Sequence, residues 1–224
     1  PILVVGGTLA SGGAGAINHS IDKDIDNTMK RTSKRPVAGE RISKSNALLF
    51  GIVLNVASFI ILTYLTNILA ALMAISGTLF YVIIYSIWLK KKTYHNIVIG
   101  GAAGCFPPLV GWSAVTGDLS LSAWYLFAII FFWTPPHFWP LAIDRMEEYK
   151  KEGVPMMPIA KGVSRTKKEM VIYAVLLLGA SLSPFFYGLT GYFYLISTAT
   201  LNLYFIYLCI SYLNDENNQL SDRK

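Results

Sequence analysis

The chain has 224 residues, of which 54% are hydrophobic and only 14% are charged, and its mean hydropathy is +0.47. A soluble domain carries roughly 25% charged residues, so this composition excludes an ordinary soluble protein and favours an integral membrane protein. The net charge is +6, from 19 basic and 13 acidic residues.

Apolar stretches long enough to cross a bilayer recur along the chain. A crossing helix needs about 17–25 residues, and stretches near this length lie at 46–64, 68–88, 97–115, 121–142, 170–189 and 191–213. Residues 1–17 look like the second half of another such helix. Within them, the small residues of 11–16 would let two helices approach closely in lipid. We therefore predict an all-α, polytopic transmembrane helix bundle.

The basic residues predict how the chain is oriented. Every Lys and Arg lies in the long polar segments at about 18–45, 89–96 and 143–169 or in the C-terminal tail, and none lies in the short connections. By the positive-inside rule, the long segments are cytoplasmic. We therefore expect a multi-pass protein of the cell membrane whose polar chemistry faces the cytoplasm. The positive charge is then a topology signal and does not indicate nucleic-acid binding.

Three oxygen-bearing side chains recur every fourth residue where the first apolar segment ends. Asn18, Asp22 and Asp26 would lie close to one face of an α-helix. Mg²⁺ prefers oxygen ligands and usually shares its coordination with substrate phosphates, so this row predicts a metal site. Solvated or capping carboxylates are the alternative. Asp24 points away from the row, and we expect it to be solvated or paired with a base.

Basic residues follow the acidic row within a few turns. A diphosphate bound through Mg²⁺ needs carboxylates for the metal and cationic side chains for its remaining oxygens. Arg31 and Arg35 are the better candidates, because a guanidinium binds phosphate in bidentate fashion. For Lys30, Lys34 and Lys90 to Lys92, topology signalling explains the charge at least as well.

A second acidic set follows a later apolar stretch. Asp144 and Glu148 repeat the four-residue spacing, and Lys150 follows them. Two rows after two different spans suggest internal pseudo-repetition, with the rows facing each other across one cavity. Two Mg²⁺ ions on one diphosphate would neutralise the leaving group as its bond breaks.

Just upstream of the second set, the pair Pro135–Pro136 predicts a break in the helix. Irregular backbone at membrane depth is tolerated where it lines a cavity, so we expect His137 to border a pocket as a proton acceptor or as a contact to the substrate. A hydrogen-bonded histidine between helices is the alternative. The aromatic faces of Trp133, Phe138 and Trp139 would stabilise a developing cation, unless these residues face lipid.

These residues together resemble the UbiA superfamily of intramembrane prenyltransferases. The run Asn18-x-x-x-Asp22-x-x-x-Asp26 is similar to the first aspartate-rich motif of that family. Asp144-x-x-x-Glu148 is similar to the second, with Glu in place of its last Asp. The resemblance extends over essentially the whole chain.

Further runs resemble the branch of the superfamily that farnesylates haem. They are residues 22–26, Arg31-Thr32, Arg35-Pro36, Pro136-His137 and residues 148–158. The last of these runs is the most specific, because other branches differ there.

The resemblance implies one intramembrane prenyltransferase domain over residues 1–224. The family has nine transmembrane helices, and this chain accounts for about six and a half. We therefore expect a chain truncated at both ends, without the first helix, part of the second, and the ninth.

The implied activity is Mg²⁺-dependent transfer of a farnesyl group from farnesyl diphosphate to a vinyl group of haem b, giving haem O. Metal ligands would be Asn18, Asp22, Asp26, Asp144 and Glu148. Diphosphate contacts would be Arg31, Arg35 and Lys150, and the catalytic residues would be Asp22, Asp26 and His137. Membrane lipid surrounds the enzyme, and haem A synthase or factors that assemble the oxidase are candidate partners.

Two other functions remain open at this point. A related prenyltransferase would act on another acceptor, such as a quinone precursor. A cation-coupled transporter also binds cations through acids in membrane helices, but it predicts acids nearer to the middle of the spans.

Overall fold

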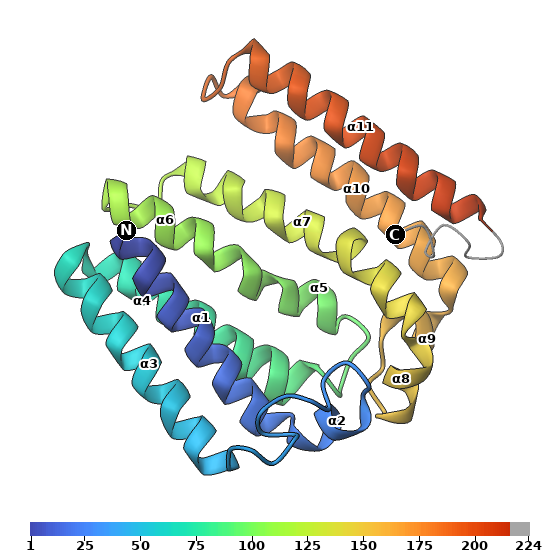
Figure 1. The fold of residues 1–224 in the computed structure, drawn as a ribbon. Helices are drawn as coiled ribbons and strands as arrows, with labels where there is room; N and C mark the ends of the chain where they lie inside the picture. The colour runs from blue at the N-terminus through green and yellow to red at the C-terminus, as the bar shows by residue number, and fades with distance from the viewer. Residues whose placement is uncertain (216–224) are drawn as a thin grey trace. The chain divides into compact units, whose positions relative to one another are not determined.

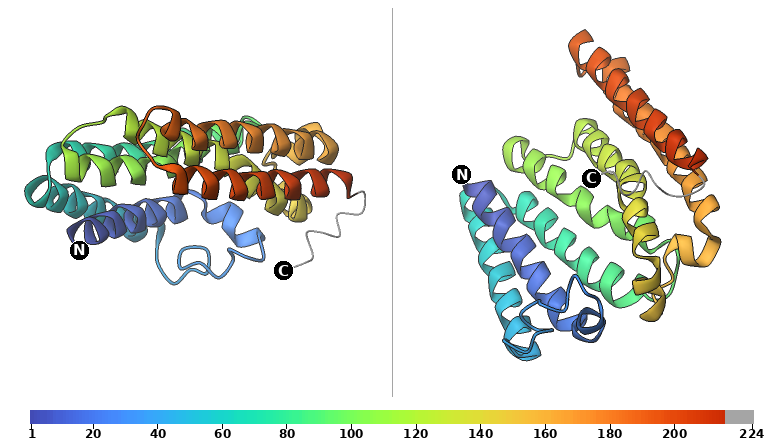
Figure 2. Two further views of the ribbon diagram at one scale, coloured as in Figure 1. Left: turned by 90° about the horizontal axis from the view of Figure 1, so that it is seen from above. Right: turned by 45° about the vertical axis from the view of Figure 1, so that its right-hand side comes forward.

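The computed structural model describes residues 1–215, and every regular element among them is helical (Figures 1 and 2). Six segments are long and apolar enough to cross a membrane. They are Lys44–Leu65, Ile68–Leu89, Asn96–Thr116, Leu121–Asp144, Val163–Phe186 and Tyr192–Asn214. The prediction of an all-α, polytopic membrane bundle is confirmed.

The chain forms two compact units, and each is described by itself. The first unit contains Pro1–Lys92 and Ala102–Leu119. The second contains Thr93–Gly101 and Ser120–Lys224, of which residues up to 215 are described.

In the first unit, long helices pack around small side chains. Its elements are α1 (Ile2–Ile21), α2 (Lys23–Thr28), α3 (Lys44–Leu65), α4 (Ile68–Leu79), the π-helix η1 (Phe80–Leu89) and α6 (Phe106–Thr116). Helix α3 packs against both α1 and α4, and α4 packs against α6. The buried cluster at the centre comprises Ala10, Leu62, Ala70, Ala71, Ala74 and Val110.

The second unit repeats part of this arrangement. Its elements are α5 (Asn96–Gly100), α7 (Leu121–Asp144), α8 (Met146–Lys151), α9 (Met157–Lys161), α10 (Val163–Phe186) and α11 (Tyr192–Asn214). The 3₁₀-helix η2 (Gly101–Cys105) joins α5 to α6. Helix α10 packs against α7 and α11, which parallels α3 against α1 and α4. Both views show α10 and α11 side by side (Figures 1 and 2).

The prediction that Pro135–Pro136 breaks the helix is wrong. Helix α7 continues through both residues and through Pro140. Proline removes a backbone donor, but Thr and Ser side chains help a membrane helix to accommodate this loss. The hydroxyl of Thr134 donates to the carbonyl of Ile130 at 2.8 Å, within the turn that the prolines disturb.

The predicted start of the fifth apolar stretch at residue 170 is also wrong. Helix α10 begins at Val163, so the charged residues that suggested a loop form its first turns. An ion pair between Arg165 and Glu169 at 2.6 Å, four residues apart, supports this turn.

Helices α1 and α3 approach each other through glycine. A Cβ atom on Gly13 would lie 2.7 Å from the carbonyl oxygen of Gly51, and one on Gly51 would lie 2.6 Å from the carbonyl oxygen of Gly13. The side chain of Asn55 also lies against the first of these Cβ positions, and that of Ile17 lies 2.6 Å from the second, so only small residues allow the two helices to pack this closely.

We predict that Gly13→Ala destabilises the protein by about 1–3 kcal/mol, since overpacking forces backbone shifts. Gly15→Ala is the control, because a Cβ there meets nothing within 4 Å. Thermal unfolding in detergent measures both. Equal unfolding temperatures for the two variants would contradict the close approach.

Candidate active site

The first acidic row spans a break between two helices. Helix α1 ends at Ile21, α2 begins at Lys23, and Asp22 between them has φ −89° and ψ 10°. Sparsely populated backbone of this kind occurs in turns and at active sites. The four-residue hydrogen-bond spacing nevertheless continues, from Asp22 N to Asn18 O and from Asp26 N to Asp22 O, both at 2.8 Å. The row is therefore kept although the helix is interrupted.

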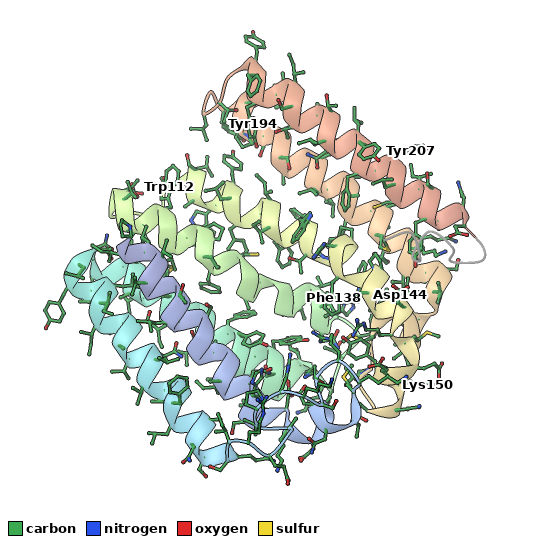
Figure 3. All side chains as sticks on the ribbon, viewed as in Figure 1. Trp112, Phe138, Asp144, Lys150, Tyr194 and Tyr207 are labelled. Atoms are coloured by element: carbon green, nitrogen blue, oxygen red, sulfur yellow. The ribbon has the colours of Figure 1, made fainter. Side chains whose placement is uncertain are left out.

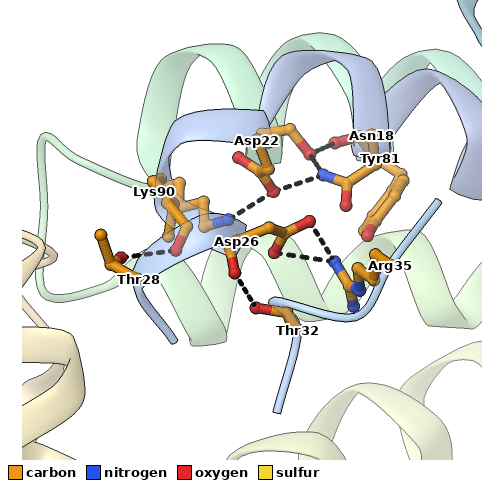
Figure 4. Close-up of polar contacts among 10 residues, drawn as sticks. Asn18, Asp22, Asp26, Thr28, Thr32, Arg35, Tyr81 and Lys90 are labelled. Carbon is orange, nitrogen blue, oxygen red and sulfur yellow. Dashed lines mark hydrogen bonds and ion pairs between the residues drawn. The ribbon is translucent and has the colours of Figure 1, made fainter. Parts of the chain in front are cut away.

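All three side chains of this row are buried, with exposed fractions of 3–4%. Oxygen Oδ2 of Asp22 accepts hydrogen bonds from Asn18 Nδ2 at 2.8 Å and from Lys90 Nζ at 2.5 Å (Figure 4). Because an unpaired buried carboxylate is costly, Lys90 at the end of η1 is the counter-ion of Asp22.

Asp26 has its own counter-ion. Arg35 Nη1 donates to both carboxylate oxygens of Asp26, at 3.1 and 2.9 Å (Figure 4). The loop that carries Arg35 is anchored by buried Met29 and Val37, and the hydroxyl of Thr32 donates to the Asp26 carbonyl at 3.2 Å. The polar segment after α2 is thus folded onto the acidic row.

The donor set fits a hard cation, although the carboxylates face basic side chains. Oxygens Oδ1 of Asn18 and of Asp22 accept no hydrogen bond from the described residues, so their lone pairs remain for another partner. Within residues 1–215, no three His, Cys, Asp or Glu side chains gather as a metal cluster. An amide and carboxylates are ligands that Mg²⁺ accepts.

The second acidic set also spans a helix break. Helix α7 ends at Asp144, Arg145 has φ −107° and ψ 22°, and α8 begins at Met146. Glu148 is partly buried, and its oxygen Oε2 is fully buried without a hydrogen-bond partner among the described residues. A buried acceptor of this kind needs an additional partner, as a metal ligand would have.

The two breaks support the idea of internal repetition, because each acidic set crosses from a long helix into a six-residue helix. The sets belong to different units. Their facing each other across one cavity therefore stays a prediction.

The predicted phosphate ligands have different surroundings. Arg35 contacts Asp26, whereas Arg31 is exposed. Lys150 is also exposed, on α8 next to the end of α7 where Asp144 lies (Figure 3). Asp24 is exposed and lies 3.6 Å from Lys44 Nζ, which confirms that it is off the acidic row.

Residues 148–158 comprise the end of α8, a turn with buried apolar side chains, and the start of α9. Gly153 has φ 65°, and the amide of Val154 donates to the carbonyl of Tyr149 at 3.0 Å. Val154 and Met156 are each 1% exposed. This run therefore fixes α8, and with it Glu148.

His137 is exposed on α7 and stacks against Trp133, with ring centroids 4.0 Å apart and planes at 16°. Trp139 is buried and packs edge-on against Tyr173. Phe138, labelled in Figure 3, is partly buried. The catalytic roles of these side chains stay predictions.

Sequence reasoning missed Ser86 and the pairing of Lys90 with Asp22. Lys90 is one of three consecutive lysines that topology signalling explains, and only the fold brings it to Asp22, 68 residues earlier in the chain. The available signal was a polar Ser86 within an apolar span, four residues before Lys90.

The profile of the UbiA prenyltransferase family matches residues 1–224. The chain belongs to this family. A protein named protoheme IX farnesyltransferase from Deinococcus radiodurans is 48% identical over 224 residues, which are 100% of this chain and 72% of that protein. The protein of the same name from Gloeobacter violaceus is 48% identical over 222 residues, 99% of this chain and 73% of that protein.

A third relative is longer. A protoheme IX farnesyltransferase of Thermus thermophilus is 50% identical over 200 residues, which are 89% of this chain and 33% of that protein. The chain thus spans about a third of that UbiA relative.

Solved structures share the UbiA fold. A homolog from Archaeoglobus fulgidus, bound to DMAPP and Mg²⁺, gives a TM-score of 0.77 at 18% identity and covers 99% of this chain and 80% of its own. The apo structure of a UbiA homolog from Aeropyrum pernix K1 gives a TM-score of 0.77 at 17% identity. The match covers 98% of this chain and 83% of the chain of that homolog.

We predict that Lys90→Met destabilises the protein by about 3–5 kcal/mol when no metal is added, because it leaves the Asp22 carboxylate buried and unpaired. The double variant Asp22→Asn/Lys90→Met recovers most of this loss, since both charges are then removed. Thermal unfolding in detergent is the measurement.

Lys91→Met is the matched control, because Lys91 is exposed at the neighbouring position. If the Lys90 variant unfolds at the same temperature as the Lys91 variant, Lys90 is not the counter-ion of Asp22.

Proposed function

We propose that this UbiA-family protein transfers a farnesyl group from farnesyl diphosphate to a vinyl group of haem b, giving haem O. One observation carries this proposal: relatives named protoheme IX farnesyltransferase are 48% identical along essentially the whole chain. The buried row of Asn18, Asp22 and Asp26 supports a site for the donor.

We assign metal ligands in each unit separately. Asn18, Asp22 and Asp26 would hold Mg²⁺ in the first unit, and Asp144 and Glu148 would hold Mg²⁺ in the second. When bound, Mg²⁺ supplies positive charge that neutralises the leaving diphosphate. The residues fit this role because Asn18 Oδ1, Asp22 Oδ1 and Glu148 Oε2 have no other hydrogen-bond partner among the described residues.

Basic side chains bind the remaining diphosphate oxygens. Lys90 and Arg35 neutralise Asp22 and Asp26 in this structure, and they would contact the diphosphate once those carboxylates hold Mg²⁺. Arg31 and Lys150 are exposed and meet the substrate from solvent. Charge-assisted bonds from such groups to phosphate are among the stronger hydrogen bonds.

The transfer step follows from the chemistry of the donor. The bond between farnesyl C1 and the diphosphate oxygen breaks, and the oxygen keeps the electron pair. The terminal vinyl carbon of haem gives its π electrons to C1, which forms the new carbon–carbon bond. Water adds to the cation left on the haem side and loses a proton. His137, exposed on α7, takes that proton.

The aromatic side chains beside His137 shield the allylic cation and exclude bulk water from it. Trp133 stacks on His137, so its π face is held next to the proposed base. Aromatic faces attract cations, and water exclusion prevents hydrolysis of the intermediate.

We place the enzyme in the cell membrane with this site at the cytoplasmic face, because all basic residues lie in the long segments or the tail. Haem A synthase or oxidase assembly factors would receive the product.

We predict that membranes containing the protein, given haem b, farnesyl diphosphate and Mg²⁺, yield haem with the added mass of one hydroxyfarnesyl group. EDTA abolishes the product. Asp22→Asn reduces it to background, because the metal loses a carboxylate, while the protein still inserts. Mass analysis of extracted haem measures all three.

Asp24→Asn is the control, because Asp24 is exposed and off the row, and it keeps its activity. Unchanged haem in the presence of bound donor would refute haem as acceptor and direct the search to acceptors such as quinone precursors. Normal product from Asp22→Asn would refute the metal assignment.

A further inference from the structure

Ser86 connects the π-helix to the first acidic row. Its buried hydroxyl accepts a hydrogen bond from Asn18 Nδ2 at 3.0 Å and donates one to the carbonyl of Tyr81 at 3.0 Å. Asn18 Nδ2 also donates to Asp22 Oδ2 at 2.8 Å. Asn18, the first residue of the acidic row, is therefore hydrogen-bonded to the π-helix η1, which lies 68 residues later in the chain.

These bonds have a fixed direction. A serine hydroxyl carries one proton, and here that proton goes to the Tyr81 carbonyl. Ser86 then presents only lone pairs to Asn18, and the Asp22 carboxylate likewise only accepts. Both protons of the Asn18 amide are consumed by these two acceptors. An inverted amide would place Oδ1 against two acceptors, so Oδ1 is held away from them.

The π-helix makes this arrangement available. In an α-helix, a serine hydroxyl reaches the carbonyl three or four residues earlier, and residues five apart lie about 140° apart around the axis. In η1 the wider turn brings the carbonyl of Tyr81 to Ser86, five residues later. Turns of this kind are frequent at functional sites.

We infer that Ser86 is a positioning residue that holds the Asn18 amide with Oδ1 free to bind the cation. This inference rests on the proposed function, because it takes Asn18 as a metal ligand. Ser86 touches neither the metal nor the substrate, and it acts only through the orientation of Asn18. Mutation of a residue that hydrogen-bonds to a metal ligand typically lowers metal affinity by 10- to 100-fold.

The test measures binding and not turnover. The dissociation constant of Mn²⁺ is determined by electron paramagnetic resonance on the purified protein in detergent, with inorganic diphosphate present. Ser86→Ala weakens Mn²⁺ binding about 10-fold, whereas Ser86→Thr, which keeps the hydroxyl, binds as the wild type does. Ser86→Cys keeps a weak donor and a weak acceptor, so its Mn²⁺ affinity lies between those of the other two variants. It replaces the alanine variant in the test if that variant does not fold.

Ser58→Ala is the matched control. Ser58 is buried in the same unit and donates to the carbonyl of Gly6 at 2.7 Å, without contact to Asn18. It loses a comparable hydrogen bond, so its unfolding temperature falls as that of Ser86→Ala does, while Mn²⁺ affinity stays unchanged. Equal Mn²⁺ affinity in Ser86→Ala and Ser58→Ala would overturn the inference.

Asn18→Asp separates orientation from packing. A carboxylate donates no hydrogen bond to Ser86, so Ser86→Ala has no such bond to remove and changes Mn²⁺ affinity less than about 2-fold in that background. A full 10-fold loss there would show that Ser86 acts through packing, and the inference fails.

Asp22→Asn reports on the proposed function itself. If Asp22→Asn loses Mn²⁺ binding while Ser86→Ala binds as the wild type does, the role of Ser86 is refuted and the metal site is not. Wild-type binding by Asp22→Asn refutes the metal site and, with it, this inference.

Discussion

Two carboxylates buried around the break between α1 and α2 constrain this unit of the protein. Asp22 and Asp26 are each 3% exposed, and an unpaired charge at such a place costs several kcal/mol. Each carboxylate has its own basic partner. Lys90, at the end of the π-helix, pairs with Asp22, and Arg35, on a loop anchored by apolar side chains, pairs with Asp26.

The same pairing connects stability with chemistry. In the proposed function, the cations that neutralise the acids in this structure would also bind the diphosphate. Binding would then exchange partners among charges and would not create charge in an apolar place. The position of Glu148, with a buried oxygen that has no partner among the described residues, suggests that the second unit completes its bonds only with a ligand.

Much of the fold could be predicted, because apolar stretch length and the location of Lys and Arg are strong signals in membrane proteins. Five of the six predicted stretches lie within a few residues of the observed helices, and the fifth failed because Arg165 and its charged neighbours suggested a loop. The predicted break at the prolines of α7 was wrong for a similar reason. Proline disfavours a helix locally, but the packing of α7 in the fold overrides this propensity.

The candidate site was predictable only in part. The four-residue spacing identified Asn18, Asp22 and Asp26, since it needs nothing beyond the geometry of one helix. The breaks at Asp22 and Arg145 could not be predicted, because no glycine or proline marks them. The partner of Asp22 lies 68 residues away, and the polar Ser86 in the apolar span before it is only a weak signal of that pairing. The roles of His137, Arg31 and Lys150 stay predictions.

Because of the π-helix, the segment between α4 and Lys90 must keep its length. Each residue in a helix turns the chain by about 100°, so deleting one residue from Phe80–Leu89 would carry Lys90 away from the face that meets Asp22. Substitutions in this stretch change one side chain at a time, whereas a single insertion or deletion rotates every residue after it. Relatives that keep this chemistry should therefore vary in composition along the segment and remain uniform in its length.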